Sequence, residues 1–340
     1  MLYILFVGYL HLEMYFVHMF IHTSTVFEGT WMNKFILALS VFMASSAIAE
    51  AKSYREMFGS EPNLSPEYSA IVGSLDFKQG KVSLPAAQAQ LDIPVEFYFL
   101  DPADTKKVLV DLWGNPPGSA EGHLGMVFPA KYAPDADKAW GSVIDYLKDG
   151  YVSDADALTT DFTELLAQLK EASAENNIER EKQGYDPITL VGWASPPHYD
   201  LATHTMHWAR DLIFGKDPNA PHTLNYSVRI LSREGVLQMN FVSGLEQLDE
   251  IKSGLPGVTG MVQFDAGQAY ADFKEGDAVA AYGMAGLIAA GAGAKVAAKA
   301  GLLAVALAFL KKGGVLIVIA GAAAMRFFKG LLGRKEPPSA

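Results

Sequence analysis

Two stretches near residue 230 alternate apolar and polar side chains, and this pattern restricts the fold more than any other feature of the chain. In LNYSVRI (224–230) and VLQMNFV (236–242) every second residue is apolar, and the turn SREG separates the two stretches. Such alternation is typical of strands with one buried face and one polar face, and the short connection predicts a hairpin. ITLVGW (188–193) and THTMHWARDLIF (203–214) resemble a second hairpin. Four consecutive strands therefore predict an antiparallel sheet.

Two capped helices are predicted before the part of the chain that forms these strands. After a buried strand PVEFYFL (94–100), Asp101 is expected to cap a helix that has Pro102 at its first position and ends at Gly114. Asp161 and Glu164 are spaced as a capping pair, before a helix that Gly184 would end. One face of that helix is apolar, formed by Phe162, Leu165, Leu166 and Leu169. The predicted fold class is α+β, an antiparallel sheet with packed helices, followed by a C-terminal helical membrane segment.

The segment 32–49, MNKFILALSVFMASSAIA, has the parts of an export signal, with the cleavage point before Glu50. A lysine precedes a short apolar run, and the run ends in small residues. We therefore predict a signal peptide, and we attribute residues 1–31 to a mis-annotated upstream start, with translation beginning at Met32. A first membrane helix in 1–31 is the alternative, although Glu13 and three histidines interrupt its apolar sequence.

Charge divides the rest of the chain into an acidic body and a basic tail. Residues 50–277 carry 35 acidic and 18 basic side chains, a net charge of −17, whereas residues 278–340 carry a net charge of +7. The body has no basic stripe for a phosphate backbone, so we expect no nucleic-acid partner. The chain also lacks cysteine, which excludes disulfides, thiolate metal sites and a lipoprotein anchor.

The tail is rich in alanine and glycine and predicts attachment to a membrane. Apolar blocks at 279–294, 300–310 and 313–328 are separated by lysines that can reach the interface from helix ends. We predict membrane-anchoring helices over 278–332, a polar end at 333–340, and a lipid bilayer as partner. A helical hairpin buried against the body and an amphipathic segment on anionic lipid are the alternatives. The extracytoplasmic α+β body, 50–277, is then expected on the periplasmic side of the cell membrane.

Six motifs occur in order along the chain from about Val95 to the tail. They are VEFYFLDPADTKKVLVDLWGNPPG, GMVFPA, YLKDGYVSDADA, LVGWASPPHYDLATHTMHWARDL, LNYSVRILSREGVL and YADFKEGDAVAAYG. Together they resemble a family of bacterial membrane-anchored proteins known only as a domain of unknown function. The resemblance implies a membrane anchor and a location in the bacterial envelope, but it supplies no catalytic residues.

The densest group of chemically capable side chains is PPHYDLATHTMHWARD (196–211). Histidine and carboxylate can bind zinc or act in acid–base catalysis, although no HExxH spacing occurs. His198 and His204 are the metal candidates. On a strand, His204 shares a face with Met206 and Trp208, whereas His207 lies opposite. The catalytic candidates are His198, Asp200, His204, His207 and Asp211, with Arg210 beside them.

Two functions fit these observations. The first is a membrane-anchored, non-enzymatic envelope protein that binds an envelope protein or supports the envelope, with no cofactor. The alternative is a membrane-tethered hydrolase or metal-dependent enzyme that uses the cluster from His198 to Asp211.

Overall fold

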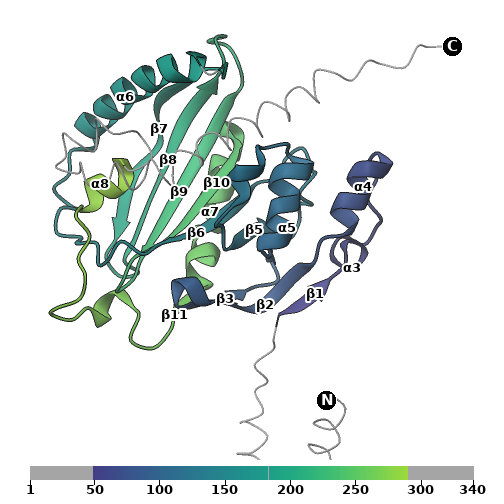
Figure 1. The fold of residues 1–340 in the computed structure, drawn as a ribbon, viewed down its shortest axis with the longest axis horizontal. Coiled ribbons are helices and arrows are strands. Elements are labelled where there is room, and N and C mark those ends of the chain that lie inside the picture. Colours follow the sequence, from purple (N-terminus) through teal and green to yellow (C-terminus); the bar gives the residue numbers. More distant parts are fainter. Residues whose placement is uncertain (1–48, 183, 290–340) are drawn as a thin grey trace, which may run out of the picture. The chain divides into compact units, whose positions relative to one another are not determined.

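A computed structural model describes residues 49–182 and 184–289 (Figure 1), and these residues form an 11-stranded sheet. The strand order is β11-β3-β2-β4-β5-β6-β10-β9-β8-β7, with β1 paired to β2, and every pairing between these strands is antiparallel. The strands are β1 (Glu50–Lys52), β2 (Phe77–Leu84), β3 (Ala89–Ile93), β4 (Phe97–Leu100), β5 (Gly125–Pro129), β6 (Gly141–Leu147), β7 (Ile188–Asp200), β8 (Thr205–Phe214), β9 (His222–Leu231), β10 (Val236–Gly244) and β11 (Val262–Phe264). The predicted antiparallel sheet is confirmed.

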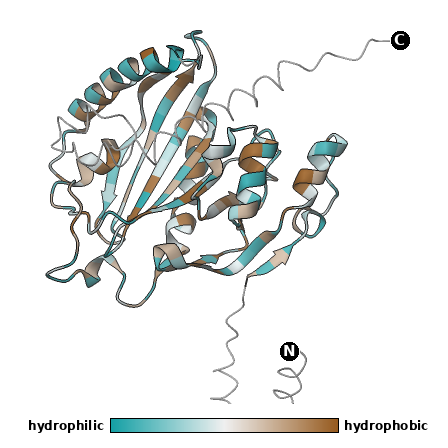
Figure 2. Cartoon of the chain, viewed as in Figure 1, coloured by the Kyte–Doolittle hydropathy of each residue, from teal (hydrophilic) through white to brown (hydrophobic). Residues whose placement is uncertain are grey.

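Helices pack on both faces of this sheet. They are α3 (Tyr54–Phe58), α4 (Pro66–Gly73), α5 (Pro102–Lys106) with its π-helical continuation Lys107–Leu112, α6 (Phe162–Lys182), α7 (Leu248–Gly260) and α8 (Met284–Ala289). We call the side on which α6 packs the α6 face and the opposite side the α7 face. Polar residues predominate along α6, in keeping with a helix that has only one stripe against the core (Figure 2).

Both predicted hairpins are present. β7 pairs directly with β8, and β9 pairs directly with β10, each pair antiparallel. The polar side of β9 differs from the prediction, however, because the alternation suggested that Ser227 and Arg229 face solvent, whereas both are buried. The reason is that β9 is a central strand whose two faces are both covered.

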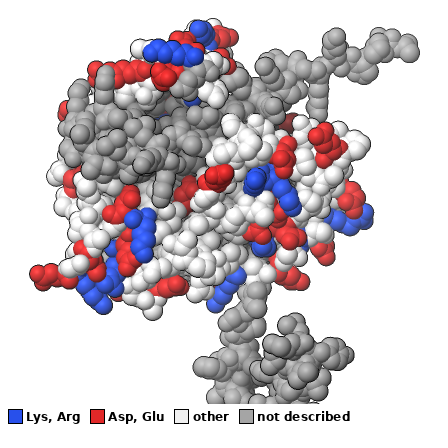
Figure 3. Space-filling view, viewed as in Figure 1, with Lys and Arg blue, Asp and Glu red and all other residues white. Residues whose placement is uncertain are grey.

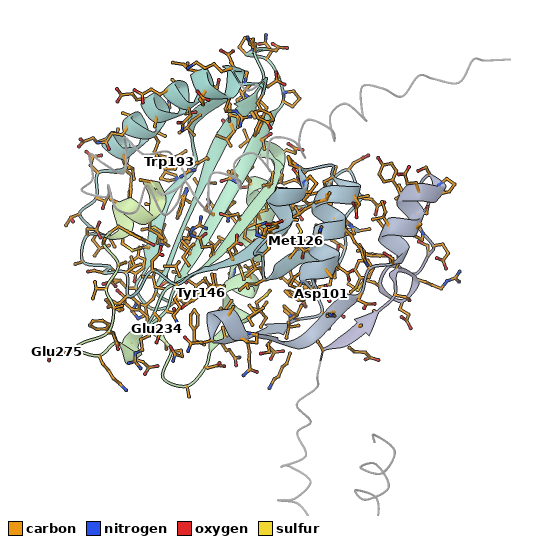
Figure 4. All side chains as sticks on the ribbon, viewed as in Figure 1. Asp101, Met126, Tyr146, Trp193, Glu234 and Glu275 are labelled. Atoms are coloured by element: carbon orange, nitrogen blue, oxygen red, sulfur yellow. The ribbon has the colours of Figure 1, made fainter. Side chains whose placement is uncertain are left out.

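Three apolar clusters fill the two faces. On the α7 face, one large cluster joins β8, β9 and β10 to α7 and to β3. On the α6 face, one cluster packs α6 and α8 against β7 and β8, and another packs α3, α4 and the helix that begins at Pro102 against β4 and β5. Trp193 and Met126, labelled in Figure 4, belong to these two clusters respectively. Between these two clusters, the α6 face is formed by strands β8, β9 and β10.

The predicted helix caps are present. The Asp101 carboxylate, labelled in Figure 4, accepts from the main-chain N–H groups of Ala103 and Asp104 at 2.9 and 3.0 Å. Asp161 accepts from Thr163 and Glu164 in the same way at the start of α6. Each cap satisfies N–H groups that a helix leaves without a partner in its first turn.

The body extends beyond Asp277, where the sequence placed its end. Main-chain hydrogen bonds join Tyr151 to Ala278 and Ala280, each at 2.8 Å, and the Asp156 carboxylate accepts from the first N–H groups of α8. Leu287 and Ile288 are buried in the same cluster as α6. Residues 278–289 are therefore part of the folded body, although their alanine and glycine content resembles that of the tail.

None of the helices within residues 49–289 is both long and apolar enough to cross a membrane. The predicted upstream segment and all of the signal peptide but Ala49 precede the described residues, and most of the predicted anchoring segment and the polar end follow them. On the face that Figure 3 shows, the Lys and Arg side chains of the described body are scattered among Asp and Glu.

Candidate functional site

The residues predicted from the sequence lie at separate places on the sheet. His198 of β7 pairs across the strands with His207 of β8, and the two rings face each other on the α7 face. His204 precedes β8 and contacts Tyr270 on the α6 face. The sheet therefore separates His198 from His204, the two predicted metal ligands. In the described part of the chain, no three His, Cys, Asp or Glu side chains are placed to hold a metal ion together.

Two of the carboxylates have structural partners instead. Asp200 accepts from the main-chain N–H of Ala202 at 2.8 Å and so stabilises the β7–β8 turn. Asp211 lies near the other end of β8, where its carboxylate is 2.6 Å from Nδ1 of His222. The five catalytic candidates thus share no common site.

His204 belongs to a small polar arrangement at the turn. Its Nδ1 lies 3.2 Å from the Tyr199 hydroxyl, which donates to the Asp154 carboxylate at 2.8 Å. The backbone of His204 is left-handed, with φ of 48°, and its carbonyl accepts from Leu231 at 3.0 Å. Left-handed residues are common in hairpin turns, so these contacts fix the turn.

A second group, which the sequence did not single out, lies on the α6 face of β8, β9 and β10. We call it the arginine cluster: Trp208, Arg210, Ser227, Arg229 and Asn240. The sheet register places Trp208, Ser227 and Asn240 side by side on three neighbouring strands. Arg210 and Arg229 are two residues from Trp208 and Ser227 and so point to the same face. Arg210 and Arg229 are only 9% and 8% exposed.

Both guanidinium groups are held by uncharged oxygens. Arg210 Nη2 donates to the Ile288 carbonyl of α8 at 2.7 Å. Arg229 donates to the Val228 carbonyl and to Asn240 Oδ1, each at 2.9 Å. Their Cζ atoms lie 6.0 and 5.1 Å from the Trp208 ring, within the range of cation–π attraction. Among the described residues, neither guanidinium forms an ion pair with a carboxylate.

Four buried donors of the cluster remain without a hydrogen-bond partner in the described body. They are Trp208 Nε1, Arg210 Nε, Arg229 Nε and Asn240 Nδ2. The orientation of Asn240 is fixed because its Oδ1 accepts from both Arg229 Nη2 and, at 3.3 Å, Ser227 Oγ. Its NH₂ group is therefore available as a donor.

Burial lowers the pKa of both arginines. It lowers the pKa of Arg210 to about 10, and burial together with the neighbouring charge of Arg210 lowers the pKa of Arg229 to about 9. Both groups remain protonated at neutral pH. The cluster therefore keeps two positive charges in a region of low polarity, where unpaired charges are costly.

Asp145 of β6 adds a negative charge to the surroundings of Arg229. Asp145 is aligned through Gln238 with Arg229, and its charge raises the pKa of Arg229 against the effect of burial. Its Oδ1 is already 2.6 Å from Nδ1 of His123, while Oδ2 is buried without a partner in the described body. Burial lowers the pKa of His123, but the contacts with Asp145 and the Ser119 carbonyl outweigh burial and raise it. The carboxylate of Asp145 is thus hydrogen-bonded to His123 and influences Arg229 only through its charge.

The arrangement can bind an acceptor-rich, negatively charged group. All four unpartnered groups are donors, and guanidinium groups match the oxygens of phosphate, sulfate or carboxylate. The sequence gives little sign of the burial of Arg210 and Arg229, since Arg229 stands at a position that the alternation of LNYSVRI predicts to be polar. Their burial was missed because strand alternation alone does not tell whether the second face is covered.

Comparison with known proteins places the chain in a family. A family model described as "Protein of unknown function (DUF2167)" matches residues 76–322. The chain belongs to this family. The DUF2167 match includes the arginine cluster and α8 and continues past Ala289, and it confirms the uncharacterised family that the six motifs resemble. No curated protein matches the chain.

One solved structure has limited similarity to this DUF2167 chain. The solution structure of cyanobacterial PsbP (CyanoP) from Synechocystis sp. PCC 6803 is 11% identical in sequence and covers 54% of this chain and 91% of its own, with a TM-score of 0.30. Similarity at this level does not establish a shared fold.

Proposed function

We propose that this DUF2167 protein is a non-enzymatic binding protein of the bacterial envelope and that its ligand carries an anionic group bound at the arginine cluster. One observation supports the binding role above all. Two guanidinium groups, each more than nine-tenths buried, have no carboxylate partner among the described residues. Buried charges are normally paired, and an anion from outside the body would supply the missing charge.

The unpartnered donors indicate the chemistry of the ligand. Arg210 Nε, Arg229 Nε and Asn240 Nδ2 can each donate to an oxygen of an oxyanion. Trp208 adds an indole donor and an aromatic surface between the two guanidinium groups. An oxyanion with several acceptor atoms, such as a phosphate, sulfate or carboxylate group, fits this set better than a neutral ligand.

We also infer that residues after Ala289 hold the body at the cell membrane, with the body on the periplasmic side. The support is the sequence of the tail, whose apolar blocks are separated by lysines; the last block contains Arg326 and is followed by Lys329. Since Arg210 is bonded to the carbonyl of Ile288, the proposed binding site lies beside the point where the chain leaves the described body.

Thermal unfolding of the full chain in detergent tests the binding role. Phosphate, sulfate and citrate are added as choline salts and compared with choline chloride at equal ionic strength. A ligand at 100 times its dissociation constant stabilises the native state by about 2.7 kcal/mol, which is a measurable rise in Tm. Arg210→Met and Arg229→Met should lose this rise. Arg233→Met, which removes a half-buried guanidinium that is already paired with Asp277, should keep it.

The proposal is wrong if no oxyanion raises Tm more than chloride does, or if Arg233→Met loses the response as fully as the two cluster variants.

A further inference from the structure

His198 and His207 form a pair on the α7 face that the arginine cluster does not involve. They are directly opposite each other on β7 and β8, with ring centroids 5.3 Å apart and ring planes inclined by 53°. His198 is exposed and His207 is half-buried, so solvent reaches the pair from the side of β7, the last strand of the sheet. Both residues belong to paired strands, and the register of β7 has an irregularity directly before His198, between Ser195 and His198.

The spacing matches that of two imidazoles bound to one metal ion. Metal–nitrogen bonds of about 2.0–2.1 Å with tetrahedral angles place two imidazole ring centres roughly 5 Å apart. Cross-strand neighbours have Cβ atoms about 4.5–5.5 Å apart, so both rings can turn one nitrogen toward a shared position without moving the strands.

Tyr226 orients the ring of His207 through a hydrogen bond. Its hydroxyl lies 2.9 Å from Nδ1 of His207 and also hydrogen-bonds the Ser195 side chain. Burial raises the pKa of Tyr226 to about 12, so this group remains a hydroxyl. When it accepts from Nδ1–H, the Nε2 lone pair of His207 is free to bind a ligand. Metal-binding histidines are usually oriented by such a contact.

We propose that His198 and His207 form a two-histidine site for a divalent transition-metal ion of the class of Cu²⁺, Ni²⁺ and Zn²⁺. These ions favour imidazole nitrogen, unlike Mg²⁺ and Ca²⁺, which favour oxygen. Two protein ligands leave further coordination positions for water or for a donor from another molecule. Among the three ions, Cu²⁺ is expected to bind most tightly. The proposal does not depend on the arginine cluster.

The test is a titration of the untagged full chain in detergent, after treatment with EDTA and desalting. Electron paramagnetic resonance of added Cu²⁺ and calorimetry with Zn²⁺ report nitrogen ligation and affinity. Because other histidines of the chain contribute to total uptake, the variants are compared with the wild type. His198→Gln and His207→Gln should each weaken the strongest site at least tenfold, and Tyr226→Phe should weaken it less.

The matched controls are His204→Gln and His222→Gln, which should retain the wild-type affinity. Unfolding in EDTA checks that each variant is folded, and His198 is exposed enough that its substitution should leave the fold intact. If His207→Gln unfolds, His198→Gln alone decides the outcome. Wild-type affinity in His198→Gln, or an equal loss in His204→Gln, overturns the proposal.

Discussion

Arg229 is buried near the C-terminal end of β9 but is bonded only to uncharged oxygens, of Val228, Met239 and Asn240. Such bonds orient the guanidinium group without neutralising it. A residue retained for stability alone would be expected to have a carboxylate partner, since an unpaired buried charge destabilises the native state. Under the proposed function, Arg229 is a residue at which stability and binding oppose each other.

Without ligand, Arg229→Met should leave the free energy of unfolding unchanged or raise it by about 1–3 kcal/mol. The physical reason is that a methionine of similar length fills the space without the desolvation of a charge. Urea denaturation in choline chloride buffer measures the difference. A loss of more than about 3 kcal/mol would show that Arg229 is a structural residue, and the binding role would lose its main support.

Arg233, unlike Arg229, is paired with a carboxylate. Its Nε and Nη2 donate to the two Asp277 oxygens at 2.7 and 2.8 Å, and these bonds, followed by the Lys274 N–H, lower the pKa of Asp277 from 3.8 to about 2. In Arg233→Gln the pKa of Asp277 should rise toward 3.8, as carboxyl NMR shifts would report.

The sign of the pH dependence follows from that shift. A carboxyl whose pKa is lowered in the folded state stabilises the protein above its unfolded pKa, and this stabilisation is lost as the pH falls through the folded value. The wild type should therefore exceed Arg233→Gln in stability above about pH 4, and the difference should vanish toward pH 2. A difference that persists unchanged at pH 2 would contradict the assignment. Arg55→Gln, in an exposed pair with Glu61, is the control.

At the scale of elements, the sequence predicted those whose signals are local. Asp101 and Asp161 cap their helices as expected, and Gly184 has the left-handed backbone, φ of 80°, that follows the end of α6. α8 was assigned to the tail because its residues, MAGLIA, are as small and apolar as those that follow. Only the distant contact with Asp156 distinguishes it, and sequence pattern does not reveal contacts across 128 positions.

β3 was missed although a signal exists. Its apolar residues Ala89, Leu91 and Ile93 alternate with polar ones, as the buried and exposed positions of the strand do. The arginine cluster was missed for a different reason, because the burial of Arg229 depends on helices that pack from elsewhere in the chain.

The link between the Asp156 loop and α8 can be tested directly. Asp156→Ala removes the acceptor of the Met284 and Ala285 N–H groups and should lower the free energy of unfolding by about 0.5–2 kcal/mol. Glu121→Ala, at an exposed position, is the control and should change it by less than about 0.5 kcal/mol. Equal effects of the two substitutions would contradict the cap.

The apolar packing of α8 should contribute more to the free energy of unfolding than its cap by Asp156 does. Leu287 is 1% exposed, and Leu287→Ala should lower the free energy of unfolding by about 2–5 kcal/mol, through lost burial and the cavity that remains. Denaturant unfolding at constant detergent measures it. A loss below about 1 kcal/mol would mean that α8 does not pack as described.

At the scale of the molecule, the folded body has its C-terminal limit at or after Ala289. A chain of residues 50–289 should unfold cooperatively, whereas a chain of residues 50–277 should not. The shorter chain lacks Tyr282, Met284, Leu287 and Ile288, and burial of each large apolar side chain contributes about 1.5–3 kcal/mol, against about 5–15 kcal/mol of total stability. Cooperative unfolding of both chains with equal midpoints would contradict this limit.

The most direct test of the binding site is anomalous diffraction from crystals of the full chain grown with selenate in place of other oxyanions. We predict an anomalous selenium peak at the cluster. The oxygens of the selenate there should lie about 2.7–3.2 Å from the Nε atoms of Arg210 and Arg229, with Asn240 Nδ2 as a further donor. No peak at the cluster under saturating selenate, with these donors bonded instead to main-chain carbonyls of residues after Ala289, would contradict an anion-binding role.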